Sequence, residues 1–78
     1  MKEVVIKVAP FVFKQTIFIK ENGEWRTVAV PHKELASFIS LEPEISKVHL
    51  FGNEKLIKKI QEECVTKYSL SNIEFNFN

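Results

Sequence analysis

The chain begins with the alternation of apolar and polar positions that is typical of β-strands. Apolar residues recur at every second position from Val4 to Val8, and the intervening Val5 makes this strand nearly continuous, as a central strand would be. Pro10 then interrupts the pattern. A second run, Phe11 to Lys20, is rich in β-branched and aromatic residues, and Trp25 to Val30 matches it. We therefore predict three strands in succession.

Asn22 and Gly23 lie between the second and third runs and are the preferred residues of a two-residue hairpin turn. Such a turn fixes the register, so Lys20 should face Trp25 and Phe18 should face Thr27. One face of the hairpin then carries Ile17, Ile19, Val28 and Val30. The other face carries Thr16, Phe18, Lys20, Trp25, Thr27 and Ala29.

Helical and strand patterns alternate in the rest of the chain. Pro31 suits the first position of a short helix with an apolar stripe, and this helix must end before Pro43. Ser46 to Phe51 is the next strand, and Asn53 can cap a second helix of about four turns. The first stripe is Leu35, Phe38 and Ile39, and the second is Leu56, Ile57, Ile60, Cys64 and Tyr68. In a last strand, Ile73, Phe75 and Phe77 alternate with Asn72, Glu74, Asn76 and Asn78.

The predicted order is strand, strand, strand, helix, strand, helix, strand, in a single domain over residues 1–78. The fold class is α/β (α+β), and the simplest arrangement is one mixed five-stranded sheet of order 3-2-1-4-5 with the first strand central. Right-handed crossovers that run in the same direction place both helices on one face of the sheet. The opposite face is therefore expected to be bare.

This strand order resembles the core of the ribonuclease H-like fold over most of the chain, at the level of topology. Enzymes of that family carry a carboxylate on the first strand, another at the end of the fourth and more beyond the fifth. Here the first strand ends in Lys7-Val8-Ala9, the fourth ends in Phe51-Gly52-Asn53, and the chain stops after the fifth. A two-metal nuclease site therefore has no matching residue in this chain.

Composition narrows the possible chemistry. The net charge is +1, and no block of like charge suggests a polybasic nucleic-acid or membrane-binding segment. All ten acidic residues are Glu, which disfavours sites built on Asp, such as EF-hands and Ser-His-Asp triads. The wealth of Lys, Ile, Asn, Glu and Phe hints at an AT-rich genome, such as that of a low-GC bacterium or its phage.

The single cysteine and the N-terminal segment bear on the compartment. Cys64 alone cannot form an internal disulfide, so a reducing, cytoplasmic compartment is the default expectation. The N-terminal run contains Glu3 and Lys7 and is too short for a signal peptide or a membrane span. We expect no membrane association.

The stretch from Lys47 to Lys59 joins a strand, a glycine and a Lys-rich helix. It allows an anion site at the helix start, with Lys55 or Lys58 nearby. The alternative, in which Gly52 relieves a tight turn and Asn53 caps the helix, is favoured because a lone glycine lacks the frame of phosphate-binding motifs.

Two histidines and the cysteine are the remaining candidates for a metal or catalytic site. His32, His49 and Cys64 match no known ligand spacing, and Cys64 falls on a buried stripe where an inert thiol is usual. Glu62 and Glu63 are neighbours on a solvated helix and point apart. We therefore predict no catalytic residues, no metal and no cofactor, and a chain that is not an enzyme.

The bare sheet face is the strongest candidate for a binding surface. An apolar and aromatic cluster of this size needs a use on a small monomer, so it should meet another surface. On the central strand it includes either Val5 and Lys7 or their neighbours. The residues expected to bind a partner are Phe18, Lys20, Trp25, Thr27, His49 and Phe51.

Two kinds of partner compete for this face. An aromatic patch with few charges favours protein contact, by capture or inhibition of another protein or by homodimerisation. Alternatively, bases could stack on Phe18, Trp25 and Phe51 beside lysines, which would make a single-stranded nucleic-acid platform. The near-neutral charge favours the protein, and a regulator or inhibitor encoded by a phage or mobile element is a plausible setting.

Overall fold

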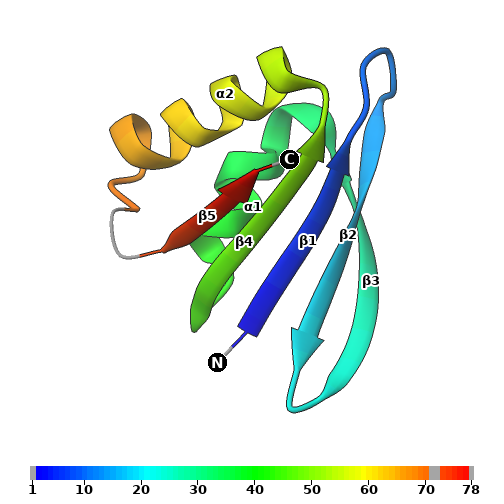
Figure 1. Cartoon of the computed structure of the whole chain (residues 1–78), viewed down its shortest axis with the longest axis vertical. Coiled ribbons are helices and arrows are strands. Elements are labelled where there is room, and N and C mark those ends of the chain that lie inside the picture. Colours follow the sequence, from blue (N-terminus) through cyan, green and yellow to red (C-terminus); the bar gives the residue numbers. More distant parts are fainter. Residues whose placement is uncertain (1, 71–72, 78) are drawn as a thin grey trace.

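The computed structural model describes residues 2–70 and 73–77, which form a mixed five-stranded sheet with two α-helices (Figure 1). The strand order is β3-β2-β1-β4-β5, as predicted. The strands are β1 (Lys2–Val8), β2 (Lys14–Glu21), β3 (Glu24–Pro31), β4 (Ile45–Gly52) and β5 (Glu74–Phe77). The helices are α1 (Leu35–Leu41), which follows a 3-10 turn η1 (His32–Glu34), and α2 (Glu54–Glu62), which continues into a π-type turn η2 (Glu63–Lys67).

The hairpin of β2 and β3 has the register that its turn residues predict. Lys20 faces Trp25, Phe18 faces Thr27, and the antiparallel pairing continues to Lys14. Asn22 and Gly23 have φ values of 54° and 80°, as a two-residue turn of type I′ requires. On the other side, β1 pairs antiparallel with β2 and parallel with β4, and β4 pairs parallel with β5.

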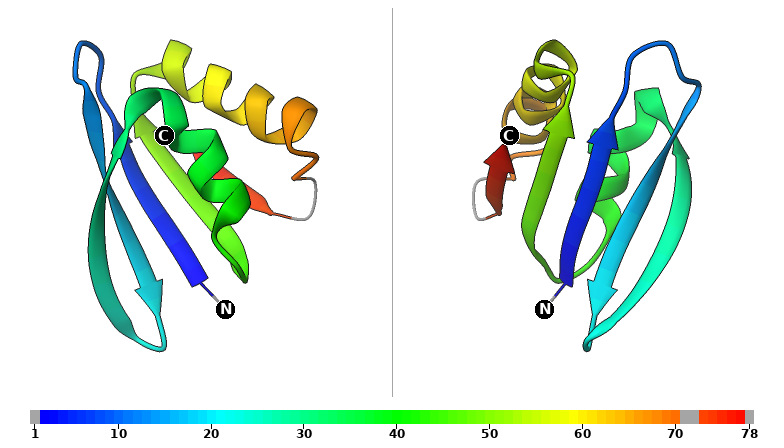
Figure 2. Two further views of the ribbon diagram at one scale, coloured as in Figure 1. Left: turned by 180° about the vertical axis from the view of Figure 1, so that it is seen from behind. Right: turned by 45° about the vertical axis from the view of Figure 1, so that its right-hand side comes forward.

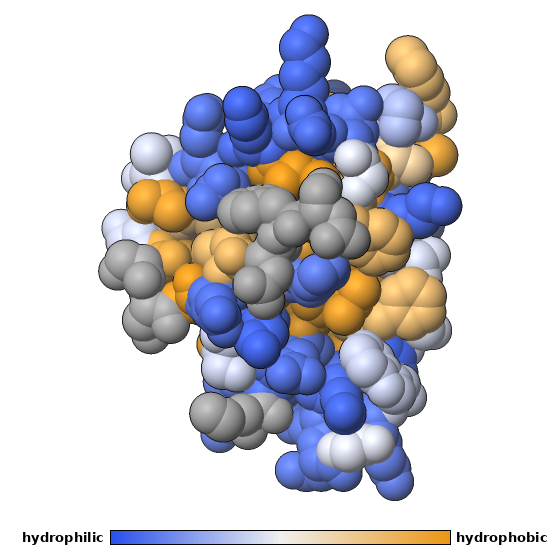
Figure 3. Space-filling model, in the orientation of Figure 1, coloured by the Kyte–Doolittle hydropathy of each residue, from blue (hydrophilic) through white to orange (hydrophobic). Residues whose placement is uncertain are grey.

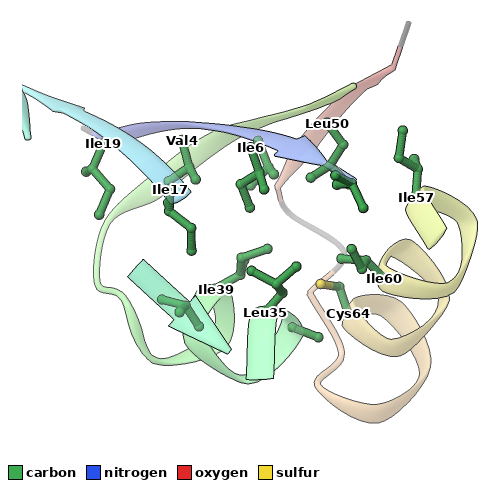
Figure 4. Close-up of a cluster of buried hydrophobic side chains, with 14 residues drawn as sticks. Val4, Ile6, Ile17, Ile19, Leu35, Ile39, Leu50, Ile57, Ile60 and Cys64 are labelled. Atoms are coloured by element: carbon green, nitrogen blue, oxygen red, sulfur yellow. The ribbon is translucent and has the colours of Figure 1, made fainter. Parts of the chain in front are cut away.

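Both helices pack against the same face of the sheet, as the two views in Figure 2 show. The core lies between them and consists of every second residue of the central strands, which the alternation in the sequence predicted. Figure 4 shows the sheet side chains pointing toward those of the helices. The sheet contributes Val4, Ile6, Val8, Ile17, Ile19, Val30, Val48 and Leu50, and the helical segments contribute Leu35, Ala36, Ile39, Ile57, Ile60 and Cys64.

The prediction that Phe11 to Lys20 forms one strand is wrong in its first residues. Strand β2 begins at Lys14, and the segment from Pro10 to Phe13 forms the loop of the β1–β2 hairpin. Phe11 has a φ of 61°, which lies outside the range of a strand. The β propensity of the Phe-Val-Phe run is therefore overridden by the need to reverse the chain.

The prediction that Pro31 opens the first helix is also wrong. Pro31 is the last residue of β3, with φ −55° and ψ 139°, and α1 starts only at Leu35 after the 3-10 turn. The N–H of His32 donates to the carbonyl of Phe13 at 2.9 Å, which carries the pairing of the hairpin past the proline. The helix ends at Leu41, before Pro43 as predicted.

The predicted cap of the second helix is confirmed. The Asn53 side chain accepts a hydrogen bond from the N–H of Leu56 at 3.1 Å. The α-helix is shorter than its apolar stripe, because the chain widens into the π-type turn in which the N–H of Tyr68 bonds to the Glu63 carbonyl. At the C-terminus Ile73 and Phe75 pack against the core. The rest of the predicted alternation in this strand lies outside what the structure describes, because it involves Asn72, Asn78 and the side chains of Asn76 and Phe77.

Gly52 is the last residue of β4 and lies beside Val8 at the end of β1. Its φ is +116°, and a Cβ atom there would lie 2.4 Å from the carbonyl oxygen of Val8. That oxygen also accepts the N–H of Asn53 at 2.9 Å, so it is held in place. Both the backbone conformation and the close approach therefore require glycine.

We expect Gly52→Ala to lower the free energy of unfolding by about 2 to 3 kcal/mol, through backbone strain and displacement of Val8. Gly23→Ala is the matched control, because Gly23 has a positive φ but nothing within 4 Å of an added Cβ. That change should cost about 1 kcal/mol. Urea unfolding measures both, and equal losses would show that the contact with Val8 is unimportant.

Candidate functional site

The face of the sheet that the helices leave uncovered is the candidate binding surface, called the open face below. The central row across it runs from Thr27 on β3 through Phe18 and Val5 to His49 on β4, because residues paired across neighbouring strands share a face. A second row places Thr16 beside Ala29 and Lys7 beside Phe51. The open face is thus apolar and aromatic along its middle.

A charged row borders this apolar middle near the start of β1. It contains Trp25, Lys20, Glu3, Lys47 and Glu74 in order across the sheet. Lysine and glutamate alternate along it, with Lys47 Nζ 3.7 Å from Glu74 Oε2 and Lys20 Nζ 5.7 Å from the centre of the Trp25 ring. Each of these lysines therefore has an acidic or aromatic neighbour.

Large aromatic side chains are exposed on the open face, as on a surface that a binding partner covers. Phe18 is 41% exposed and Trp25 is 53% exposed, while Val5, His49 and Phe51 are partly buried by their neighbours. Figure 3 looks onto this face: apolar side chains gather over its middle, between hydrophilic regions at both ends. A band of apolar and aromatic side chains flanked by polar ones is common at contacts between proteins.

All six residues predicted to bind a partner lie on the open face: Phe18, Lys20, Trp25, Thr27, His49 and Phe51. The sequence left two choices for the central strand, and the structure places Val5 and Lys7 there, since Val4, Ile6 and Val8 are buried on the other side. The rings of His49 and Phe51 lie side by side, with centroids 6.0 Å apart.

The sequence analysis missed a second exposed apolar feature, the loop between β1 and β2. Phe11 is fully exposed and Phe13 is 82% exposed. Beside the loop lies a groove of about 340 Å³, lined by Ala9, Pro10, Phe11, Val12, His32, Asn53, Lys55 and Leu56. The turn register contained the signal, because it pairs Lys14 with Pro31, the last residue of β3, and leaves Phe11 and Val12 beyond the end of that strand.

Gln15 fixes the base of this loop. Its side chain is buried, and its Nε2 donates to the Ala9 carbonyl at 2.8 Å and lies 3.0 Å from His32 Nδ1. Buried polar groups need hydrogen-bond partners, and these two contacts allow the Gln15 side chain to be buried at the end of the core. It also engages His32, which the sequence analysis considered as a metal ligand.

The three residues considered as metal ligands lie apart. His32 is in the 3-10 turn, His49 is on the open face, and Cys64 is buried in the core. Burial raises the pKa of the Cys64 thiol to about 11, with a smaller contribution from Glu63, so the thiol stays protonated. Within residues 2–70 and 73–77, no group of three or more His, Cys, Asp or Glu side chains could hold a metal ion.

An ionic cluster ties β1, β3 and the end of α1 together. The Glu42 carboxylate accepts hydrogen bonds from Lys2 Nζ at 2.9 Å and from Arg26 Nη2 at 2.7 Å. The hydrogen bond from Lys2, together with the charges of Lys2 and Arg26, lowers the pKa of Glu42 below its ordinary value, while partial burial opposes this shift. Every charge in the cluster has a partner, which indicates a structural role.

No family model, curated protein or solved structure matches this chain. In the part of the chain that the structure describes, no helix is long and apolar enough to cross a membrane.

The Glu42 cluster predicts how stability depends on pH. A lowered pKa in the folded state means that Glu42 contributes stability above about pH 4.5, and this contribution is lost as pH falls through the folded-state value. We expect Glu42→Gln to lose about 1 kcal/mol at pH 7 and to respond less to acid. Urea unfolding from pH 7 to pH 3 tests this, with exposed Glu34→Gln as control. An unchanged acid response in Glu42→Gln would contradict it.

Proposed function

We propose that this chain is a non-enzymatic binding module whose open face contacts the surface of a protein. The observation that carries the proposal is the half exposure of Phe18 and Trp25 on a sheet face that the helices leave uncovered. Phe18 lies in the apolar middle and Trp25 in the row that borders it, and exposed aromatic residues are among the side chains that contribute most to protein contacts. Capture or inhibition of another protein is the corresponding biological role.

Charge pairing on the open face supports a protein as the partner. Lys47 Nζ lies 3.7 Å from the Glu74 carboxylate, and Lys20 pairs with Glu3 across the sheet with its ammonium over the Trp25 ring, so both lysines have neighbours on this face that offset or engage their charge. A surface that binds phosphates needs cations without such partners. This balance favours an uncharged or mixed surface over a nucleic-acid backbone.

The placement of the reactive side chains supports a role without catalysis. Cys64 is buried with a raised pKa, His32 is engaged by Gln15, and His49 lies beside Phe51 on the open face. A nucleophile and a general base must lie within hydrogen-bond reach of each other. The buried free thiol also fits a reducing compartment, so we propose a cytoplasmic protein.

Single-stranded nucleic acid is the second candidate partner. Lys7 lies beside Phe51, and Lys14 is exposed at the same end of the sheet, so cations stand next to an aromatic side chain there. Bases could stack on Phe18, Trp25 and Phe51 while these lysines meet the phosphates. Trp25 is the only tryptophan, so its fluorescence would report binding of an oligonucleotide.

We expect Phe18→Ala and Trp25→Ala to abolish capture of a protein partner, because each removes an aromatic contact from the open face. Each should change the free energy of unfolding by less than about 1 kcal/mol, since both side chains are half exposed. Affinity capture with the wild-type chain, followed by measured binding of the captured protein to each variant, checks the first point. Thermal unfolding checks the second.

Leu41→Ala is the matched control, because Leu41 is an apolar residue with 79% exposure at the end of α1, away from the open face. It should bind as the wild type does. Equal loss of binding in Leu41→Ala, or unfolding of Phe18→Ala, would contradict the proposal. Binding of an oligo(dT) probe that weakens steeply with salt would move the assignment to nucleic acid.

A further inference from the structure

The outer edge of β3 carries a row of backbone groups that can pair with another strand. Hydrogen bonding alternates along an antiparallel pair, and the two-residue turn makes Glu21 and Glu24 a hydrogen-bonded pair. Counting from there, Arg26 and Val28 direct their N–H and C=O groups toward β2. Trp25, Thr27 and Ala29 direct theirs away from the sheet.

Two observations at the other end of β3 confirm this alternation. The N–H of His32 bonds to the Phe13 carbonyl at 2.9 Å, so this pair is hydrogen-bonded and the next pair, Lys14 with Pro31, is not. Pro31 has no N–H and occupies an outward-facing position, where a proline is tolerated. The outward set is therefore Trp25, Thr27 and Ala29.

This edge lacks most of the features that block pairing in other proteins. Strand β3 is eight residues long, pairs with β2 without a bulge and has its proline only at the end. Arg26, one of its two charged residues, is bound to Glu42. In both views of Figure 2, α1 lies over the sheet, inside the edge that β3 forms.

We propose that a second copy of this chain pairs with the β3 edge in antiparallel orientation, with the two-fold axis at Thr27. Thr27 then faces Thr27 of the second copy, and Trp25 faces the second copy's Ala29. The outward groups of all these residues meet one another and form about six backbone hydrogen bonds. At both ends of the contact the large Trp25 side chain of one copy also lies beside the small Ala29 side chain of the other.

Neighbouring registers are less favourable, which makes the edge self-complementary in one register. A shift toward the turn sets Arg26 directly opposite Arg26 of the second copy, and like charges at facing positions are destabilising. A shift the other way sets Trp25 opposite Pro31, which cannot donate a hydrogen bond. In the proposed register Arg26 faces Val28, so its aliphatic stem can cover a partly buried valine.

The pairing extends the protein to one continuous sheet with both open faces on the same side. Closed two-fold contacts of this kind use the same patch on both copies, as the commonest protein dimers do. The inference goes beyond the proposed function, because it uses the edge of β3 and leaves Phe18 and Phe51 uncovered.

The mass in solution tests the pairing. Light scattering after size-exclusion chromatography should give twice the 9.1 kDa mass of one chain for the wild type. Thr27→Pro removes an outward N–H that β2 does not use and should halve the mass, while Thr27→Val keeps that N–H and should remain dimeric. A wild-type protein that stays monomeric at every concentration would overturn the proposal.

A cysteine at the two-fold axis gives a second test that does not depend on folding of the proline variant. Facing Cα atoms in a hydrogen-bonded pair lie about 5.5 Å apart, within the range that a disulfide spans. Mild oxidation should therefore crosslink Thr27→Cys and leave Glu24→Cys monomeric on a denaturing gel, since Glu24 faces Val30. The buried Cys64 should stay unreacted in both.

The variant Phe18→Ala separates this inference from the proposed function. It should lose the protein partner of the open face and keep the dimer mass and the Thr27→Cys crosslink. If Phe18→Ala becomes monomeric while Thr27→Pro remains dimeric, the copies meet through the open face and the edge pairing is wrong. Equal crosslinking of Thr27→Cys and Glu24→Cys would also overturn it.

Discussion

One layer of apolar side chains between the sheet and two helices holds this fold together. Val4, Ile6 and Val8 of the central strand β1 are buried in it, and neighbouring strands add their own inward residues. Burial of such side chains is the main favourable term in folding. Because both crossovers place their helices on the same side, the layer protects only one face, and the described chain has no third helix to cover the other.

The turn residues and the alternation of side chains made much of the fold predictable. Asn22 and Gly23 determined the register of β2 with β3, and that register determined which face Phe18 and Trp25 occupy. Gly52 and Asn53 were also correctly interpreted as a tight turn and a helix cap. In each case a local backbone requirement and the global packing favour the same structure.

The errors arose where tertiary contacts decide between local alternatives. The Phe11 to Phe13 segment has the composition of a strand, but the hairpin of β1 and β2 reverses there, and Gln15 fixes the base of the loop. Pro31 suits a helix start, but the ladder with β2 extends past it. Secondary-structure propensity is a weak guide at such positions, since Phe11 to Phe13 suit a strand or a loop and Pro31 suits a strand end or a helix start.

The open face and the β3 edge meet at Trp25. Its side chain lies on the open face, with the Lys20 ammonium over its ring, while its backbone groups point out of the sheet. Thr27 and Ala29 continue this strip along β3. A partner on the face and a partner on the edge would thus both cover the same tryptophan, so the two uncovered surfaces form one region of the molecule.

The most direct test of the central claim, that this chain makes its contacts through the uncovered surface around Trp25, is the solvent accessibility of that indole. Acrylamide quenching of its fluorescence can be followed as the chain concentration is raised, because Trp25 is the sole tryptophan. The account predicts that quenching falls and the emission moves to shorter wavelength as the copies associate. Quenching that stays constant over the whole concentration range would contradict pairing at the β3 edge, and quenching that also stays constant when a captured protein partner is added would contradict contact through this surface.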